Sequence, residues 1–346
     1  MKIAKILSLV VAVVFVISAV GCGPKATPTV AAPAEVKTSG GYVIPVAKCA
    51  PNCTYKDMTV GFIQTGSEGG WRAANTGSFN ETSKQLGLNL KFYDAQNKFE
   101  NQISAFRNFI QDPDVNVIVL SALEAAGWDE VLQEAKAAKK LVVLQDRRID
   151  SPENLYLTFI GADFVEEGRK AGNEMCKLLE GSAKKNVVEL VGNVGASAAI
   201  DRGKGFRETM TACGITITQS QTGNWSATEG KAVMEAWLKA SKDIQGVFAQ
   251  NDEMGIGAAQ AINEAGLKAG TDIKIISVDA TAGAFNAMIK GDINTVVECN
   301  PLLAPQVFEV ALKGLNGDTT LPAWVPSQEG VFYAADAATI LPTRKY

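Results

Sequence analysis

From residue 58 almost to its end, the chain alternates short apolar runs with stretches of helical period. V-N-V-I-V-L (115–120) and I-K-I-I-S-V (273–278) have the length and β-branched content of buried strands. Between such runs lie stretches such as 100–111, whose apolar residues recur on one face of a helix. Regular β-α alternation is typical of parallel sheets covered by helices on both faces. We therefore predict an α/β fold.

The expected elements are too many for one compact core. The expected strands are 58–64, 88–95, 115–120, 141–145, 156–162, 187–191, 215–221, 246–250, 273–278 and 295–298. The expected helices are 71–86, 100–111, 128–138, 165–179, 199–212, 227–240, 255–265, 282–290 and 303–315. Single cores stop growing near about 250–300 residues, so the 346-residue chain favours two lobes over one large sheet.

The first 22 residues have the pattern of an export signal. Two lysines precede an apolar-or-small run, 6–20, which is shorter than the roughly 20 residues of a comfortable membrane span. The run ends in A-V-G-C, which resembles a bacterial lipoprotein box with Cys22 as the lipidated first residue of the mature chain. Ala19 stands where such boxes usually have leucine, and an ordinary cleaved signal is the alternative. We expect an exported protein, tethered at most by a lipid on Cys22.

Residues 23–56 are rich in Pro, Ala, Thr, Lys and Gly and show no sustained period, which predicts a flexible spacer. Cys49 and Cys53 lie near its end. In an exported protein they are candidates for a small disulfide loop, since a metal site normally needs four ligands and no second pair lies nearby.

The remaining cysteines and the absence of histidine limit the chemistry. Cys176 and Cys213 lie near the ends of two expected helices and are candidates for a second bridge, and Cys299 is interpreted as a small buried apolar residue. With no histidine in the chain, Ser-His-Asp and Cys-His catalysis and histidine metal sites are excluded. A net charge of −4 argues against nucleic-acid binding. We predict no metal and no cofactor.

Charged and aromatic residues follow the expected strands, at the sheet edge where open α/β proteins bind ligands. They are Glu68, Trp71, Arg72, Asp146, Arg147, Arg202, Trp225, Asn251, Asp279 and Glu298. Carboxylates and guanidinium groups together satisfy hydroxyls, which both donate and accept, and tryptophan offers a face to a sugar ring. A phosphate would favour a glycine-rich helix N-terminus with cations alone. Each residue taken singly has a salt bridge or a helix cap as its alternative, but the set predicts a neutral polyol ligand.

Several motifs resemble one known family. They are G-F-I-Q-T-G-S-E-G-G-W-R (61–72), Asp146-Arg147, V-G-A-S-A-A-I-D-R-G-K-G-F (194–206), Q-N-D-E-M-G-I-G-A (250–258) and S-V-D (277–279). From about Met58 to near the C-terminus the chain resembles the periplasmic sugar-binding proteins of bacterial ABC importers, in the ribose/galactose class, and most of all their galactofuranose-binding subgroup.

The resemblance implies the type I periplasmic binding protein fold, with two Rossmann-like lobes joined by a three-segment hinge. The implied N-terminal lobe comprises residues 57–161 plus 299–324. The implied C-terminal lobe comprises 162–298 plus 325–346.

The resemblance also implies roles for individual residues. Those expected to hydrogen-bond the sugar are Arg72, Asp146, Arg147, Arg202, Asn251 and Asp279. Those expected to form the first wall of the site are Glu68, Gly69, Gly70 and Trp71. Trp225 matches an aromatic residue that stacks on the ring, and Glu298 matches a glutamine of ribose binders. Ala227 departs from the pattern, because relatives often carry arginine there, and this departure bears on which sugar is bound.

The expected function is that of a periplasmic or cell-surface solute-binding lipoprotein. As a monomer it would capture galactofuranose or a similar pentose or hexose by hinge closure and deliver it to an ABC permease. One alternative is a sensor that presents its closed form to a chemoreceptor or kinase. Another is a secreted glycosidase using Asp146 and Asp279, which neighbouring arginines disfavour because they lower carboxyl pKa values. No phosphate-binding G-x-x-x-x-G-K-[ST] loop is present, so the chain is not the importer's ATPase.

Overall fold

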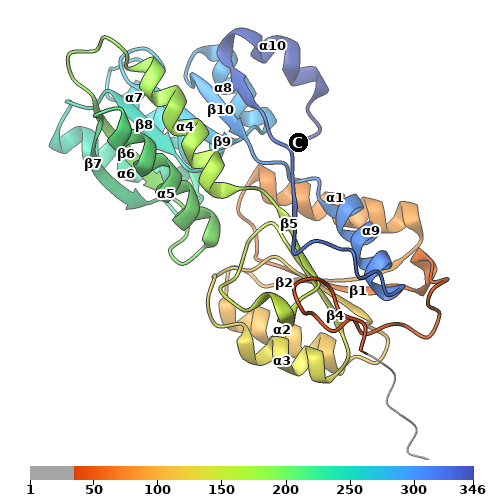
Figure 1. Cartoon of the computed structure of the whole chain (residues 1–346). Coiled ribbons are helices and arrows are strands. Elements are labelled where there is room, and N and C mark those ends of the chain that lie inside the picture. The colour runs from red at the N-terminus through yellow and green to blue at the C-terminus, as the bar shows by residue number, and fades with distance from the viewer. Residues whose placement is uncertain (1–34) are drawn as a thin grey trace, which may run out of the picture. The chain divides into compact units, whose positions relative to one another are not determined.

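The computed structural model describes residues 35–346, and Glu35–Tyr346 form one compact unit. The predicted signal peptide, Cys22 and positions 23–34 of the predicted spacer lie outside the described residues. The unit holds two α/β lobes, each built on a six-stranded sheet (Figure 1). Within the described part of the chain, no helix combines the length and the apolar content needed to cross a bilayer.

The first lobe has an entirely parallel sheet in the order β11-β5-β4-β3-β1-β2. Its strands are β1 (Thr59–Gln64), β2 (Asn89–Asp94), β3 (Val117–Leu120), β4 (Leu141–Gln145), β5 (Thr158–Gly161) and β11 (Trp324–Pro326). Its helices are α1 (Gly70–Leu86), α2 (Phe99–Gln111), α3 (Asp129–Ala137) and α9 (Ala304–Leu315). Helices α1 and α9 cover one face through a core containing Phe62, Phe79 and Phe308, and α2 and α3 cover the other. Because both faces are covered, β3 is apolar throughout and β4 is apolar up to its last residue, Gln145.

The second lobe has the order β12-β10-β9-β8-β6-β7, parallel except for β12 against β10. Its strands are β6 (Asn186–Val191), β7 (Thr216–Thr222), β8 (Gly246–Ala249), β9 (Lys274–Asp279), β10 (Thr295–Glu298) and β12 (Val331–Tyr333). Its helices are α4 (Phe164–Leu178), α5 (Ser197–Ala212), α6 (Ala227–Ala240), α7 (Asp252–Glu264), α8 (Ala282–Lys290) and α10 (Ala337–Ile340). The prediction of two lobes with parallel sheets is confirmed.

The C-terminal segment completes both sheets. β11 pairs with β5 in the first lobe and β12 pairs with β10 in the second, although the sequence predicted no strand beyond residue 298. The described chain therefore passes between the lobes after β5, after β10 and after β11. Short 3₁₀ turns complete the elements: η1 (Tyr55–Asp57), η2 (Glu153–Leu155), η3 (Ala334–Asp336) and η4 (Leu341–Thr343).

The described part of the predicted spacer, residues 35–56, is not a flexible linker but packs on the first lobe. Tyr42 and Ile44 are buried in the core that α1 and α9 share. The Tyr42 hydroxyl donates to the Lys140 carbonyl and accepts from the Val142 amide, each at 3.3 Å. The expectation is wrong here because a few anchoring apolar residues, spaced without a period, are enough to fix an irregular segment.

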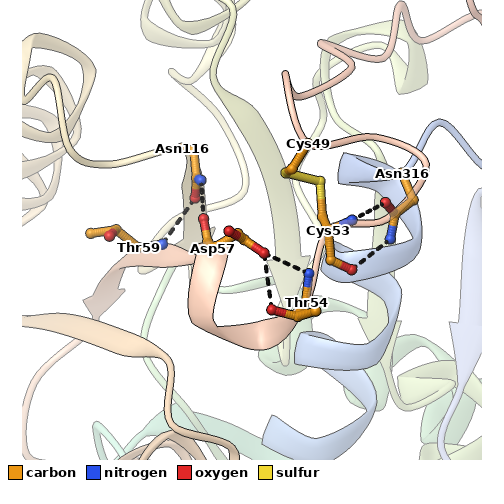
Figure 2. Close-up of a disulfide and its surroundings, with 7 residues drawn as sticks. All are labelled: Cys49, Cys53, Thr54, Asp57, Thr59, Asn116 and Asn316. Atoms are coloured by element: carbon orange, nitrogen blue, oxygen red, sulfur yellow. Dashed lines mark hydrogen bonds between the residues drawn. A yellow bond between two sulfur atoms is a disulfide. The ribbon is translucent and has the colours of Figure 1, made fainter.

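A disulfide and a clamping asparagine hold the end of this segment. The structure pairs Cys49 with Cys53, and it also pairs Cys176 with Cys213. Figure 2 shows that Asn316, the residue directly after α9, forms hydrogen bonds with both the amide and the carbonyl group of Cys53. Its Oδ1 accepts from the Cys53 amide at 2.8 Å, and its Nδ2 donates to the Cys53 carbonyl at 3.2 Å. We call residues 35–57 the N-terminal clasp.

Candidate functional site

A cavity between the lobes gathers most of the polar residues expected at the strand ends. The first lobe contributes Glu68, Trp71, Arg72, Asp146 and Arg147 to its lining. The second lobe contributes Ala198, Arg202, Trp225, Asn251 and Asp279, and Cys299 follows β10. These residues lie at the carboxyl ends of parallel strands or in the first turns of the helices that follow, where the dipoles and loops of open α/β sheets form binding sites.

Several lining residues have unusual backbone conformations. Asp146 has φ 66°, Trp225 has φ 61° and Asp279 has φ 128°, all positive without being glycine. Such conformations cost energy and persist only where the surrounding contacts enforce them. The strands therefore end in sharp turns that aim these side chains into the cavity instead of continuing the sheet.

The first-lobe side of the cavity is a buried network of alternating charges. Arg72 Nη1 lies 2.7 Å from Asp146 Oδ2, and Arg72 Nη2 lies 2.9 Å from Glu68 Oε2. Arg147 Nη2 donates to the same Glu68 oxygen at 2.8 Å. The four side chains are at most 5% exposed, so each guanidinium and carboxylate depends on its partners and not on water.

The network keeps both carboxylates ionised. Burial opposes ionisation of Glu68 most strongly, but Arg147 and Arg72 outweigh it and hold the pKa of Glu68 below its ordinary value. The pKa of Asp146 is lowered in the same way, with burial offset by Arg72 and Arg147. These groups are therefore hydrogen-bond acceptors at neutral pH.

The second-lobe side centres on Arg202. Its Nε donates to Glu167 Oε2 at 2.6 Å, its Nη1 donates to the Gln250 carbonyl at 2.7 Å, and its Nη2 lies 3.8 Å from Asp279 Oδ1. Burial would lower the pKa of Arg202, but Glu167 together with Cys299 and Asp279 outweighs burial and the pKa is raised. Burial, with further contributions from Asp252 and Glu167, raises the pKa of Asp279 well above its ordinary value despite Arg202. The raised pKa favours the neutral acid, a form that can both donate and accept.

Glu167 was missed by sequence reasoning. It lies in the first turn of α4, where a glutamate is typical merely because it complements the helix dipole. Nothing local marks it as the buried partner of an arginine 35 residues later. Ala198 was also missed, although it lies inside the 194–206 motif, and Cys299 was interpreted only as a core residue. Burial raises the pKa of the Cys299 thiol, so the reactive thiolate is disfavoured while the lobes are in contact.

Three of the predicted site residues do not line the cavity. The Gly70 amide donates to Glu253 Oε1 of the other lobe at 3.0 Å, and a Cβ on Gly69 would lie 2.6 Å from Glu253 Cγ. These glycines therefore belong to a contact between the lobes. The Glu298 carboxylate is engaged by Arg344 at 2.8 Å and by the Gly330 amide at 3.0 Å, so it is turned toward the C-terminal segment.

Direct contacts join the lobes around the cavity. The Ala125 amide donates to the Gly195 carbonyl at 2.9 Å, and Asn193 Nδ2 donates to Glu68 Oε1 at 3.2 Å. Glu68 thus joins the first-lobe charge network to the second lobe. The two lobes are thus in contact around a polar site between them.

The cluster of Glu167, Cys299 and Glu329 near the cavity is not a good metal site. Ligand atoms of Glu167, Cys299 and Glu329 lie within 4.8 Å of one another. However, Arg202 already neutralises Glu167, and burial together with Glu167 raises the pKa of Glu329 to about 10. Glu329 is therefore a neutral acid that hydrogen-bonds Glu167, which leaves one fewer anionic ligand for a cation.

Comparison with known proteins places these features in a family. The sequence model described as "Periplasmic binding protein domain" matches residues 60–319. The chain is 44% identical over 286 residues to the galactofuranose-binding protein of Escherichia coli K12, covering 81% of this chain and 89% of that protein. It is 36% identical over 268 residues to the fructose import binding protein of Bifidobacterium longum, covering 75% and 80%.

Solved structures agree with the sequence comparisons. A Mycobacterium smegmatis protein in complex with β-D-fucofuranose superposes with a TM-score of 0.81 at 46% identity, over 84% of this chain and 95% of that one. The periplasmic binding protein of the arabinose ABC transporter of Shewanella sp. ANA-3, bound to α- and β-L-arabinofuranose, gives 0.80 at 43%, over 83% and 96%. The resemblance expected from the motifs is confirmed, and the chain belongs to the periplasmic binding protein family.

Proposed function

We propose that the protein captures a neutral monosaccharide in the cavity between its lobes and delivers it to an ABC permease. One observation carries the proposal: the charges around the cavity are balanced. Three buried guanidinium groups (Arg72, Arg147 and Arg202) are paired with three carboxylates (Glu68, Asp146 and Glu167), and the raised pKa of Asp279 favours its neutral form. A site without net charge has no reason to prefer a phosphate or a cation, while its mixed donors and acceptors suit hydroxyl groups.

The furanose ring form is the best-supported choice of sugar. The two solved relatives described above, at 46% and 43% identity, are reported with fucofuranose and arabinofuranose, and the relative from Escherichia coli is named for galactofuranose. We infer that the ligand is galactofuranose or a similar pentose or hexose. Ala227 begins α6 two residues after Trp225 and is not a lining residue, so the guanidinium donors of the cavity are those of Arg72, Arg147 and Arg202.

Binding without catalysis fits the electrostatics. A glycosidase needs a carboxylic acid that donates its proton to the leaving group. Arginines hold the pKa of both Glu68 and Asp146 below the ordinary range, so neither is a proton donor at neutral pH. The Asp279 carboxyl lies 3.8 Å from Arg202, and the other carboxylates that line the cavity, Glu68 and Asp146, are engaged by arginines.

The proposed mechanism is closure of the lobes on the sugar. The crossings after β5, β10 and β11 act as the hinge, and the closed form is what the permease recognises. The export signal over residues 1–22 and a lipid on Cys22 would keep the monomeric protein outside the cytoplasm and close to the permease. Lipid attachment is tested by mass spectrometry of the mature protein, which must show a diacylglyceryl modification at Cys22.

Calorimetric titration tests the sugar-binding function. The Glu35–Tyr346 unit is unfolded, freed of carried-over ligand and refolded, and then titrated with galactofuranose, arabinofuranose, fucofuranose, galactopyranose, ribose and fructose. We expect one-to-one binding, tightest for a furanose. Refolded protein that binds no member of the panel would overturn the proposal.

A further inference from the structure

Two buried N–H groups at the cavity have no hydrogen-bond partner within residues 35–346. They are Nε1 of Trp225 and Nη1 of Arg147, and both residues line the cavity while being only 4% exposed. The neighbouring arginines differ. Arg72 uses Nε, Nη1 and Nη2, and Arg202 uses Nε and Nη1, in contacts with protein groups.

The two donors come from opposite lobes and belong to side chains that lie close together. Arg147 follows β4 of the first lobe, and Trp225 follows β7 of the second. The guanidinium carbon of Arg147 lies 5.6 Å from the centre of the Trp225 ring. An oxygen atom reached by both donors, or a pair of oxygens on one small ring, would therefore bridge the lobes.

Neither donor is free to turn toward another partner. Asn251 Nδ2 donates to the Trp225 carbonyl at 3.1 Å, and the ring packs over Gly192, where a Cβ would lie 1.9 Å from Trp225 Cζ2. Arg147 is held through Nη2 by Glu68 at 2.8 Å. The orientation of both N–H groups is thus fixed before any ligand arrives.

Closing the lobes over such donors is unfavourable unless the ligand supplies a hydrogen-bond acceptor for each of them. A buried donor without an acceptor loses its hydrogen bonds to water and gains none in return. Sites of this kind discriminate strongly, because an analogue that lacks the required oxygen leaves the buried group unpaired. The same pairing would link recognition to closure, since the donors meet only when the lobes are together.

We propose that Trp225 recognises the ligand by donating its indole N–H to a ligand oxygen, opposite Arg147 Nη1, and that this pair of donors makes closure selective for sugars with acceptors at both places. This role goes beyond the ring stacking expected of an aromatic residue at this position, and it rests on the proposed sugar-binding function. The required ligand is a neutral ring with oxygen acceptors directed to both lobes.

The test compares Trp225→Phe, which keeps an aromatic face and removes the N–H, with the wild-type Glu35–Tyr346 unit. Both are titrated with the tightest-binding sugar, with analogues that each lack one hydroxyl, and with the carbocyclic analogue that lacks the ring oxygen. We expect Trp225→Phe to bind the parent sugar at least about tenfold more weakly. The analogue that lacks the oxygen contacted by Trp225 should bind wild type and Trp225→Phe with the same affinity. That affinity should equal the affinity of Trp225→Phe for the parent sugar. Trp237→Phe, in the core of the second lobe and outside the cavity, is the matched control and should bind as wild type.

A second measurement keeps the proposal falsifiable if Trp225→Phe does not fold. With ¹⁵N-labelled tryptophan, the Trp225 indole resonance is assigned by elimination from Phe variants of the other four tryptophans. The sugar should shift that proton downfield and slow its exchange. The inference would be overturned if a folded Trp225→Phe protein bound the parent sugar as tightly as wild type does. It would also be overturned if the sugar did not shift the Trp225 indole resonance. A wild-type protein that binds no sugar would instead overturn the proposed function, and the inference with it.

Discussion

At the scale of single residues, the binding site depends on pairings between groups far apart in the sequence. Glu68 accepts from Arg72, Arg147 and Asn193, which lie 4, 79 and 125 residues away. One carboxylate thereby positions two guanidinium groups and contacts the other lobe. Losing one member of such a buried set leaves the others unpaired, which typically costs about 3–5 kcal/mol.

Replacing Arg147 should therefore abolish sugar binding. Arg147→Ala removes the guanidinium that lines the cavity and leaves Glu68 with one cationic partner fewer, so affinity should fall at least about 100-fold. Arg148→Ala is the matched control, because Arg148 lies over Trp324 at 4.1 Å and does not line the cavity. Calorimetry measures both variants, with circular dichroism to establish folding. An Arg147→Ala protein that binds as wild type would remove Arg147 from the site.

The sequence predicted which residues form the site better than it predicted which of them pair with each other. Strand ends are recognisable from the apolar run before them, so Asp146, Asn251 and Asp279 could be placed at the carboxyl ends of their strands from the sequence alone. The partners of these groups are set by tertiary packing, which leaves no local pattern. Glu167 is the clearest example, since it supports Arg202 from a helix with an ordinary amphipathic sequence.

At the scale of elements, the segments that cross between the lobes carry a buried acid pair. Glu329 lies between β11 and β12, and its pKa is raised to about 10 by burial first and by Glu167 second. In the unfolded chain the same group loses its proton near its ordinary value of 4.5. Between these values the unfolded state binds fewer protons than the folded state, so this group makes folding less favourable as pH rises.

Glu329→Gln should therefore stabilise the protein increasingly with pH. Glutamine offers an N–H where the neutral acid offers an O–H, and it carries no proton to lose. The gain in unfolding free energy over wild type should be small at pH 5 and grow toward pH 9, by at most about 1.4 kcal/mol per unit. Urea denaturation of both proteins at several pH values measures it. A difference that does not change with pH would show that Glu329 titrates normally in the folded state.

The N-terminal clasp is a second element with a measurable contribution. Asn316→Ala removes both hydrogen bonds to the Cys53 backbone and should lower the free energy of unfolding by about 1–3 kcal/mol. Sugar affinity should stay unchanged, because the clasp is remote from the residues that line the cavity. Asn286→Ala, whose exposed side chain bonds only its own helix, is the control. Wild-type stability in Asn316→Ala would mean that the clasp does not help to hold the fold.

The sequence predicted long periodic elements well and short or irregular ones poorly. Helices are recognisable by their period and buried strands by their apolar content, and the structure begins and ends these elements near the expected residues. β11 and β12 have only three residues each, which is too short for a period to appear. The clasp has no regular structure beyond one isolated bridge, between Lys37 and Val43, and a 3₁₀ turn, so its composition suggested a spacer.

At the scale of the whole molecule, the proposed sugar binding requires that the two lobes close over the ligand. Gly69→Ala should impair closure, since Gly69 has φ 95° and an added Cβ would meet Glu253 of the other lobe at 2.6 Å. Sugar affinity should fall at least about tenfold. Gly77→Ala, in the same helix region with nothing within 4 Å of its added Cβ, should bind as wild type and be about 1 kcal/mol more stable. Calorimetry and urea denaturation test the pair. Equal affinities for the two variants would show that Gly69 has no part in closure.

Cys299 allows the most direct measurement of whether the sugar binds in this cavity. It is the free cysteine of the described chain, it lines the cavity, and it is 3% exposed. A small thiol reagent is added to the Glu35–Tyr346 unit, and labelling of Cys299 is followed by mass spectrometry at increasing sugar concentration. We expect labelling to slow as sugar binds, with a midpoint at the calorimetric dissociation constant. Labelling that stays equally fast at saturating sugar would contradict the claim that the sugar is enclosed in this cavity.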